Sequence, residues 1–187
     1  FVSTYQSVSG SGQKAIEELK QQSRKILDGK PVQCNVYPHQ IAFNCLPHID
    51  TFMENGYTKE EMKMVDETRK ILGDNTIEVS PTAVRVPVFY SHSESVCVET
   101  ELPMGVDVIK DLLSSSPGIS LVDNPEKNEY PLAVDACGKG GVFVGRVRGD
   151  LVRDNVINFW VVSDNLLKGA ADNAVQIAEL VLKRLGN

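Results

Sequence analysis

The chain has 187 residues, a length that fits one ordinary domain or two very small ones. Hydrophobic residues make up 42% of it and charged residues 24%, which is the balance of a globular protein rather than a disordered one. Its net charge of −6 excludes a generally basic nucleic-acid binder, and no apolar run reaches the roughly 18 to 20 residues of a membrane span.

Hydrophobic periodicity predicts a chain that mixes helices with period-2 runs. The sharpest boundary is a capping box, in which Thr58 is the N-cap and Glu61 follows three residues later, ahead of a helix that stops at Gly73. In chain order, the predicted elements are a strand at 1–5, a helix at about 13–28, short extended pieces chiefly at 41–46, a helix ending at 72, period-2 runs at about 77–89 and 94–101, a helix at 107–114, a strand at 118–122, a polar loop at about 123–131, extended runs at 141–148 and 156–163, and a helix at about 166–185.

Strands and helices do not alternate strictly along this order, which favours an α+β fold over a doubly wound one. We expect a mixed, mainly antiparallel sheet with helices packed on one face. The apolar residues of the last helix cover more than half of its helical wheel, which is wider than the stripe of a helix packed on one core. We therefore expect this helix to pack on the sheet and also on a partner chain or a further segment.

The four cysteines are too sparse for a disulfide scaffold and include no C-x-x-C pair. Each lies among apolar residues, so we predict buried free thiols at Cys34, Cys45, Cys97 and Cys137. No secretory signal opens the chain, which predicts a cytoplasmic protein. Because the chain begins without Met and inside a β-prone run, we expect it to be a fragment of a longer protein.

Standard motifs for phosphate, dinucleotide or zinc binding are absent from the sequence, and its three histidines are too scattered for a metal triad. Two clusters remain. Glu60 and Lys63 lie three residues apart on one helix face, where spacing alone favours an exposed ion pair worth less than about 1 kcal/mol. Arg85, flanked by valines, suits a bidentate carboxylate clamp. A bend at Pro87 could bring it near His92, for which spacing alone favours a structural role.

Several short motifs occur in one order along nearly the whole chain, and each of them is weak alone. They are VSTYQSVSGSG at 2–12, IAFN at 41–44, PHID at 47–50, EEMK at 60–63, ET at 67–68, RVPV at 85–88, HS at 92–93, VGR at 144–146, DNL at 164–166, KGAA at 168–171 and NAVQIA at 173–178. As an ordered set they resemble the aspartate-semialdehyde dehydrogenase family, specifically its C-terminal catalytic and dimerisation domain. The resemblance implies that residues 1–187 adopt a glyceraldehyde-3-phosphate dehydrogenase-like C-terminal fold.

The resemblance also implies an activity. The family reduces L-aspartyl-4-phosphate with NADPH to L-aspartate-4-semialdehyde and phosphate, in the biosynthesis of lysine through diaminopimelate, of threonine and of methionine. By resemblance, Gln6 orients the acyl intermediate and His92 is the acid/base. Glu60 would receive the substrate's α-ammonium, Lys63 would lie near the phosphate and Arg85 would clamp the α-carboxylate. The residues implied near the nicotinamide end of NADP are Ser9, Gly10, Asn173 and Gln176.

Two parts of the family's enzyme have no counterpart in this sequence. The nucleophilic cysteine belongs to a Ser-Asn-Cys-type motif ahead of the first strand, and a Rossmann-type domain binds most of the NADP. The resemblance therefore implies a fragment that is inactive alone, whose last helix, about 166–187, packs on the nucleotide-binding domain. It further implies a homodimer formed through the sheet face, with no metal, nucleic acid or membrane partner.

Two other functions remain open. One is a stand-alone dimeric binding module, which loss of Glu60, Lys63, Arg85 or His92 would have favoured, and all four are present. The other is an N-acetyl-glutamyl-phosphate reductase-type enzyme. The substrate of that enzyme has no free α-ammonium, so the retained Glu60 argues against it.

Overall fold

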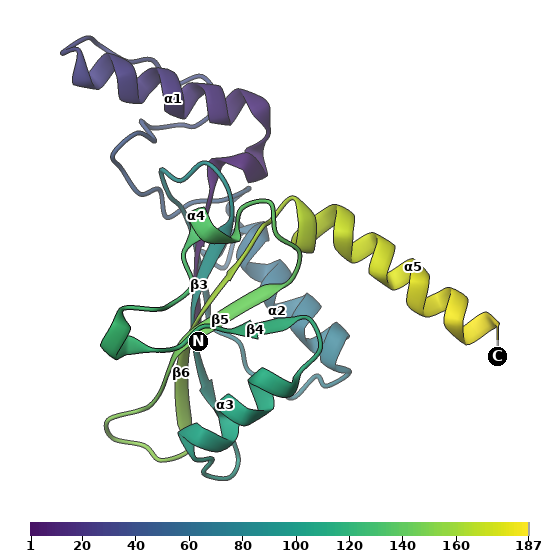
Figure 1. Ribbon diagram of the computed structural model, residues 1–187. Coiled ribbons are helices and arrows are strands. Elements are labelled where there is room, and N and C mark those ends of the chain that lie inside the picture. Colours follow the sequence, from purple (N-terminus) through teal and green to yellow (C-terminus); the bar gives the residue numbers. More distant parts are fainter. Residues whose placement is uncertain (187) are drawn as a thin grey trace. The chain divides into compact units, whose positions relative to one another are not determined.

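The computed structural model describes residues 1–186, which divide into two compact units (Figure 1). Unit 1 comprises Phe1–Phe89 and Glu94–Val98, and unit 2 comprises Tyr90–Ser93 and Glu99–Asn187. Each unit has its own strands, helices and apolar core. The core of unit 1 gathers around Val8, Leu19 and Ile41, and that of unit 2 around Val144, Val147 and Ile157.

Unit 1 contains three strands in the order β2-β1-β3. β1 and β2 are parallel and in register along their whole length. On the other side of β1, Phe1 and Cys97 exchange two backbone hydrogen bonds of 2.9 Å, which is an antiparallel pattern. The elements of this unit are β1 (Val2–Gln6), a 3-10 turn η1 (Val8–Ser11), α1 (Gln13–Leu27), α2 (Lys59–Leu72), β2 (Pro81–Arg85) and most of β3 (His92–Glu99).

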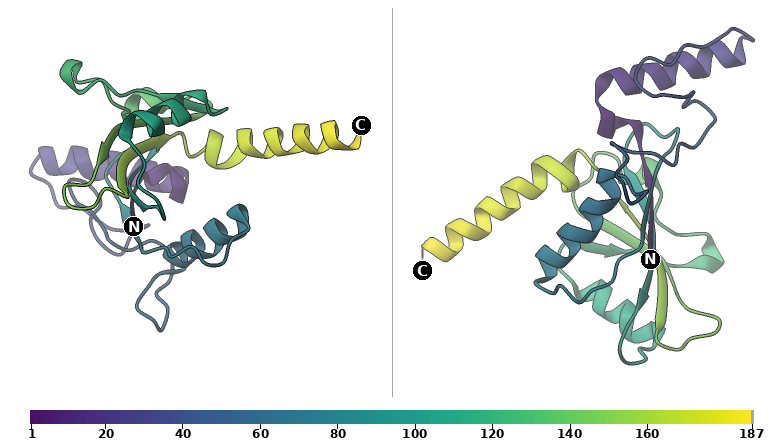
Figure 2. Two further views of the ribbon diagram at one scale, coloured as in Figure 1. Left: turned by 90° about the horizontal axis from the view of Figure 1, so that it is seen from below. Right: turned by 180° about the vertical axis from the view of Figure 1, so that it is seen from behind.

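The long segment that follows α1 folds back beside this helix (Figure 2), where polar side chains of α1 hold it. The buried Glu18 carboxylate accepts hydrogen bonds of 2.7 Å from the backbone N–H groups of Asn35 and Val36. The side-chain carbonyl of Gln22, also buried, accepts a bond of 3.0 Å from the N–H of Ile41. These side chains satisfy backbone donors that would otherwise need a neighbouring strand.

This arrangement explains why the predicted extended piece at 41–46 is wrong. The segment folds as turns, and its sheet-like contact is one isolated bridge between Leu46 and Arg85, with backbone bonds of 2.9 and 2.8 Å. Sequence patterns do not reveal that buried polar residues of an earlier helix can take the place of a strand partner.

The capping box of α2 is confirmed. The N–H of Glu61 donates to the hydroxyl of Thr58 at 3.3 Å, and the N–H of Thr58 donates to the carboxylate of Glu61 at 2.8 Å. The other oxygen of Glu61 accepts from the N–H of Ala83 at 3.0 Å, which ties the start of α2 to β2. The helix ends at Gly73, whose φ of 68° lies in the left-handed region that favours glycine.

Unit 2 contains strands in the order β6-β5-β4, with β4 parallel and β6 antiparallel to β5. An irregularity between Gly145 and Arg148 interrupts the β5–β6 pairing, and the carboxylate of Asp123 accepts the N–H of Arg146 there at 2.8 Å. The elements of this unit are α3 (Val106–Ser115), β4 (Ile119–Leu121), a 3-10 turn η2 (Pro125–Lys127), α4 (Ala133–Ala136), β5 (Val142–Gly149), β6 (Val156–Ser163), a π-helical turn η3 (Leu167–Ala171) and α5 (Asp172–Leu185).

The predicted α+β fold with a mixed sheet is confirmed, and most boundaries lie within a few residues of the prediction. The predicted run at 77–89 is shortened to β2, because the chain leaves the sheet at Val86 and Pro87. The four-residue α4 was not predicted, since one turn of helix carries too little periodicity to detect.

The last predicted helix differs from the prediction in two ways. A π-helical turn at 167–171 precedes α5, and no residue of α5 is buried. The expected packing of this helix on the sheet is therefore wrong, while its expected packing on a further domain stays a prediction. The apolar side chains that α5 leaves exposed are Val175, Ile177, Leu180, Val181, Leu182 and Leu185.

The burial predicted for the cysteines is also wrong. All four are free thiols, but Cys34, Cys45 and Cys137 are exposed and Cys97 is partly exposed. The first two lie on the segment that α1 holds at the surface, where apolar sequence neighbours do not determine burial. Among residues 1–186, no helix combines the length and the apolar character needed to cross a membrane.

Candidate functional site

The parallel pairing of β1 and β2 brings two of the predicted site residues to one sheet edge. Gln6 and Arg85 end these strands and are direct register partners. Side chains of directly paired residues lie on the same face of a sheet, so both project from the same edge and face. Gln6 is 7% exposed and Arg85 is 6% exposed, so both polar side chains are held inside the protein.

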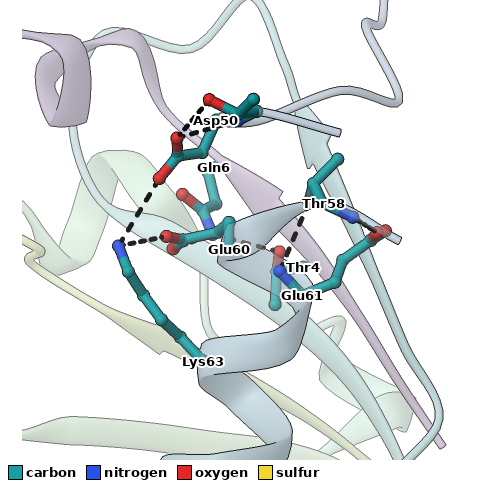
Figure 3. Close-up of polar contacts among 8 residues, drawn as sticks. Thr4, Gln6, Asp50, Thr58, Glu60, Glu61 and Lys63 are labelled. Carbon is teal, nitrogen blue, oxygen red and sulfur yellow. Dashed lines mark hydrogen bonds and ion pairs between the residues drawn. The ribbon is translucent and has the colours of Figure 1, made fainter. Parts of the chain in front are cut away.

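Gln6 connects this sheet edge to the first turn of α2 (Figure 3). Its side-chain amide donates to a carboxylate oxygen of Glu60 at 3.1 Å and to the hydroxyl of Thr4 at 3.3 Å. The Glu60 side chain is 26% exposed, so it lies partly inside the protein. Because the capping box occupies Glu61, Glu60 is the first-turn carboxylate that contacts Gln6 at the sheet edge.

Lys63 lies between two carboxylates on the outer side of this cluster. Its ammonium donates to the second oxygen of Glu60 at 3.1 Å and lies 3.9 Å from an oxygen of Asp50 (Figure 3). The hydrogen bond that Lys63 donates to Glu60, followed by the charges of Glu60 and Asp50, raises the pKa of Lys63 above its usual value. The Glu60–Lys63 pair is therefore more than an isolated surface contact, because Gln6 fixes its carboxylate from the protein interior.

Arg85 supplies a second, buried cation. Its guanidinium donates to the backbone carbonyl of Ser7 at 2.7 Å, which uses one of its five N–H donors. Burial lowers the pKa of Arg85, while the charges of Tyr37 and Glu60 act in the opposite direction. The guanidinium remains a cation, because arginine is not deprotonated in proteins. The N–H groups of Arg85 that Ser7 does not use are suited to a bidentate pair with a carboxylate.

Gln6, Glu60, Lys63 and Arg85 thus form one polar cluster in unit 1, in which the charge of one carboxylate acts on two cations. We call this set the α2 cluster. It presents one negative and two positive groups to a ligand. Sequence reasoning missed Asp50 and Thr4, which support the cluster. Asp50 was visible within the PHID motif, but its backbone φ of 68° carries no signal in the sequence.

His92 lies in unit 2, at the start of β3, and its side chain is partly exposed. The preceding residue, Ser91, has a φ of 70°, and its N–H donates to the side chain of Asn165 at 3.1 Å. This bend fixes the backbone directly before the histidine. Arg85 belongs to unit 1, so the predicted approach of Arg85 and His92 stays a prediction.

The predicted cofactor residues of unit 2 lie together at the start of α5. The ammonium of Lys168 donates to the side-chain carbonyls of Asn173 at 3.2 Å and Gln176 at 2.6 Å. Each amide therefore keeps its NH2 group as a donor for another partner. We call these three residues the α5 cluster. Sequence reasoning did not identify Lys168 as a site residue. Its contacts with Asn173 and Gln176 depend on the π-helical turn at 167–171, and hydrophobic periodicity does not predict such a turn.

The predicted cofactor residues of unit 1 lie in η1. Ser9 is buried and its hydroxyl lies 3.0 Å from that of Ser7, while Gly10 is exposed. The backbone N–H of Ser9 donates to the carbonyl of Phe89 at 3.1 Å, which anchors the turn. Their proximity to Asn173 and Gln176 stays a prediction, because those residues belong to unit 2. Over residues 1–186, no three His, Cys, Asp or Glu side chains are grouped to hold a metal ion.

Comparisons with known proteins agree with the family suggested by the motifs. A family model described as the semialdehyde dehydrogenase dimerisation domain matches residues 1–168. The aspartate-semialdehyde dehydrogenase of Aquifex aeolicus is 55% identical over 183 residues, covering 97% of this chain and 54% of that protein. The enzyme of the same name from Shewanella violacea is 58% identical over 183 residues, covering 97% of this chain and 54% of its own length.

Solved structures give the same result for the fold. The crystal structure of aspartate-semialdehyde dehydrogenase II from Vibrio cholerae, complexed with ASA, matches with a TM-score of 0.93 and 55% identity. The match covers 97% of this chain and 54% of that one. The chain therefore spans about half the length of the curated relatives and solved structures it matches.

Proposed function

The chain belongs to the family of semialdehyde dehydrogenase dimerisation domains, and from that membership we propose that it is the substrate-binding and dimerisation part of an aspartate-semialdehyde dehydrogenase. The proposed enzyme reduces L-aspartyl-4-phosphate with NADPH and yields L-aspartate-4-semialdehyde and phosphate. The observation that carries the proposal is the α2 cluster, in which the carboxylate of Glu60 pairs with Lys63 and its charge acts on the buried Arg85.

The charges of this cluster complement a small zwitterionic acyl phosphate. The α-ammonium of the substrate would bind Glu60, and its α-carboxylate would bind the unused donors of Arg85 in a bidentate pair. The phosphate would lie at Lys63, the exposed end of the cluster. Gln6, which is hydrogen-bonded to Glu60, would keep that carboxylate in place and orient the acyl intermediate. An N-acetylated substrate has no ammonium to bind Glu60, which argues against the related reductase.

His92 is the proposed acid/base. In the direction of semialdehyde oxidation, it would pass the proton of the nucleophilic thiol to the aldehyde oxygen as the thiohemiacetal forms. The neutral imidazole would then accept the proton of the thiohemiacetal hydroxyl as hydride leaves. None of the four cysteines lies in the family's Ser-Asn-Cys-type motif, so the thiol would come from a segment outside these 187 residues. These residues alone are therefore proposed to be inactive.

The α5 cluster fits the proposed NADP site. Asn173 and Gln176 offer amide NH2 donors that match the carbonyl of a nicotinamide carboxamide, and Lys168 holds both amides by their oxygens. In unit 1, the exposed backbone at Gly10, beside Ser9, is the proposed second neighbour of this end of the cofactor. The bound cofactor would supply the hydride, while most of its binding surface would belong to a separate nucleotide-binding domain.

We propose two partners for the apolar surface of the chain. The exposed apolar side chains of α5 would pack on the nucleotide-binding domain, which would remove them from water. A second copy would cover the sheet face and form an isologous homodimer, in keeping with the dimerisation-domain family. The pathways to lysine, threonine and methionine and the cytoplasmic location remain parts of this proposal.

The test is an assay of the full-length gene product that contains this chain. It should reduce NADP⁺ with L-aspartate-4-semialdehyde only when inorganic phosphate or an equivalent anion is present. The substitution His92→Asn should lower kcat by about 100- to 10,000-fold, the range of general acid–base catalysis, with the KM for the semialdehyde little changed. His39→Asn is the matched control, since His39 is exposed outside both clusters.

Two results would contradict the proposal. Activity with N-acetyl-glutamate semialdehyde and none with the aspartate compound would favour the related reductase. No reduction with either aldehyde would leave the stand-alone dimeric binding module as the remaining hypothesis.

A further inference from the structure

Asp50 has an unusual local conformation next to the α2 cluster. Its φ of 68° lies in the left-handed region, which Asp and Asn adopt more readily than most other residues. One carboxylate oxygen accepts from the N–H of Thr51 at 2.8 Å and from its hydroxyl at 3.3 Å. The other oxygen faces the ammonium of Lys63 at 3.9 Å (Figure 3). Thr51 therefore holds the carboxylate with one oxygen turned toward this lysine.

Without a ligand, Lys63 is bound mainly by Glu60. That hydrogen bond is 3.1 Å long, against 3.9 Å for the contact with Asp50. Both oxygens of Glu60 are already engaged, one by Lys63 and the other by Gln6. A ligand ammonium that binds Glu60 competes with Lys63 for the single negative charge of this carboxylate, because the two cations repel each other.

This competition creates a positioning problem for Lys63. The side chain is long, 55% exposed and free to take many rotamers once its nearest partner is engaged elsewhere. The phosphate of the substrate needs the ammonium at the same moment. Asp50 is the second anion within reach, and its own orientation does not depend on Lys63, because Thr51 fixes it.

We propose that Asp50 is a positioning residue that keeps the Lys63 ammonium at the phosphate position while the substrate ammonium occupies Glu60. The inference rests on the proposed function, because it assigns the ammonium to Glu60 and the phosphate to Lys63. An ammonium has three donors, so Lys63 can bind the phosphate and remain paired with Asp50. When substrate binds, the Glu60–Lys63 pair is replaced by a pair between Glu60 and the substrate ammonium and a pair between Lys63 and the phosphate.

The experiment uses Asp50→Asn in the full-length gene product. Asn keeps the oxygen that accepts from Thr51 and tolerates the positive φ, so the substitution removes the charge and little else. We expect the KM for inorganic phosphate to rise roughly three- to fivefold, as suits an exposed ion pair, while kcat at saturating phosphate stays within about twofold.

Asp74→Asn is the matched control. Asp74 also accepts from a threonine, with bonds of 2.7 and 2.6 Å from the N–H and hydroxyl of Thr76, but it lies beyond the end of α2 rather than beside Lys63. It should leave the KM for phosphate unchanged. A rise of the same size in both variants would show a general loss of local structure and would overturn the proposal.

A second measurement separates positioning from any direct contact of Asp50 with substrate. In a Lys63→Ala background, Asp50→Asn should no longer change the KM for phosphate, since there is no ammonium left to hold. An undiminished effect in that background, or a wild-type KM in the single variant, overturns the inference while the proposed function stands. If the wild-type protein shows no phosphate-dependent activity, the proposed function fails and this inference fails with it.

Discussion

The α2 cluster of unit 1 and the α5 cluster of unit 2 both place a lysine against side-chain oxygens near the start of a helix. In the α2 cluster, Lys63 donates to the carboxylate of Glu60, which Gln6 holds from the interior. In the α5 cluster, Lys168 donates to two neutral amides, those of Asn173 and Gln176. The two sites therefore share a donor type and differ in the charge of the acceptors.

This difference determines which ligands each cluster suits. The carboxylate of Glu60 can exchange its lysine for another ammonium at little electrostatic cost, because one cation replaces another. Neutral amides cannot bind a cation so strongly, but they retain NH2 donors for a carbonyl, and Lys168 keeps its full charge for an anion. The α2 cluster thus suits a zwitterion, and the α5 cluster suits a polar group that carries no positive charge.

Among the variants that test this difference in ligand preference, Glu60→Gln should have the largest effect on substrate binding. It replaces the carboxylate of the α2 cluster by a neutral amide like those of the α5 cluster. The amide would keep a carbonyl for Gln6 or Lys63 but lose the negative charge that binds an ammonium. A hydrogen bond to a charged group contributes about 1.5 to 3 kcal/mol, so the KM for L-aspartate-4-semialdehyde should rise roughly 10- to 100-fold. Steady-state kinetics of the full-length gene product measure this directly.

Glu67→Gln provides the control for that variant. Glu67 lies on the same helix and its charge acts on Lys63 only weakly, as the last of the causes that raise the pKa of this lysine. We expect its semialdehyde KM to remain within about twofold of wild type, since exposed charge pairs contribute little. Equal effects of the two substitutions would mean that net charge, and not the α2 cluster, governs substrate binding.

Lys168→Met should have a smaller effect, confined to the other cluster. It would release the side-chain carbonyls of Asn173 and Gln176, and their amides would lose a fixed orientation. We expect the KM for NADP⁺ to rise about fivefold and the KM for the semialdehyde to stay unchanged. Lys139→Met, which removes a charge from the same unit near the ring of Phe143, should change neither constant. A semialdehyde effect at Lys168 would contradict the division between the clusters.

Local chemistry explains which parts of the fold could be predicted from the sequence. The start of α2 depends on Thr58 and Glu61 alone, and both capping bonds form as expected. The segment at 41–46 depends instead on Gln22, which lies in an earlier helix and binds its backbone. No pattern within the segment signals that contact. The sequence therefore predicted an extended piece where the chain folds as turns.

The candidate site shows the same limit. Spacing on a helix brings Glu60 and Lys63 together, but it cannot distinguish a solvated pair from one that Gln6 fixes across 54 residues of sequence. The motif resemblance implied that Gln6 and Glu60 serve one site, but it did not imply the hydrogen bond between them. The role of Asp50 was not predicted, because a positive φ at a non-glycine residue is visible only in the folded chain.

The smallest predicted effect concerns stability at alkaline pH. The pKa of Lys63 is raised above its ordinary value, chiefly by the hydrogen bond that its ammonium donates to Glu60. A raised pKa means that the pair contributes its full stability below the pKa of the unfolded chain and loses it as pH rises through the folded value. Because Lys63 is 55% exposed, this contribution should be less than about 1 kcal/mol.

The measurement is urea unfolding of the wild type and of Lys63→Met, from about pH 9 to about pH 11.5. Other groups that ionise in this range affect both proteins, so they cancel in the difference between the two free energies of unfolding. We expect that difference to shrink as pH rises, because the wild type alone loses a charged partner for Glu60. Glu60→Gln should weaken this pH dependence without abolishing it, since the hydrogen-bonded carboxylate is lost but Asp50 stays beside Lys63. A difference that stays constant across the range would mean that Glu60 and Lys63 are not coupled in solution, and the comparison between the clusters would then rest on ligand binding alone.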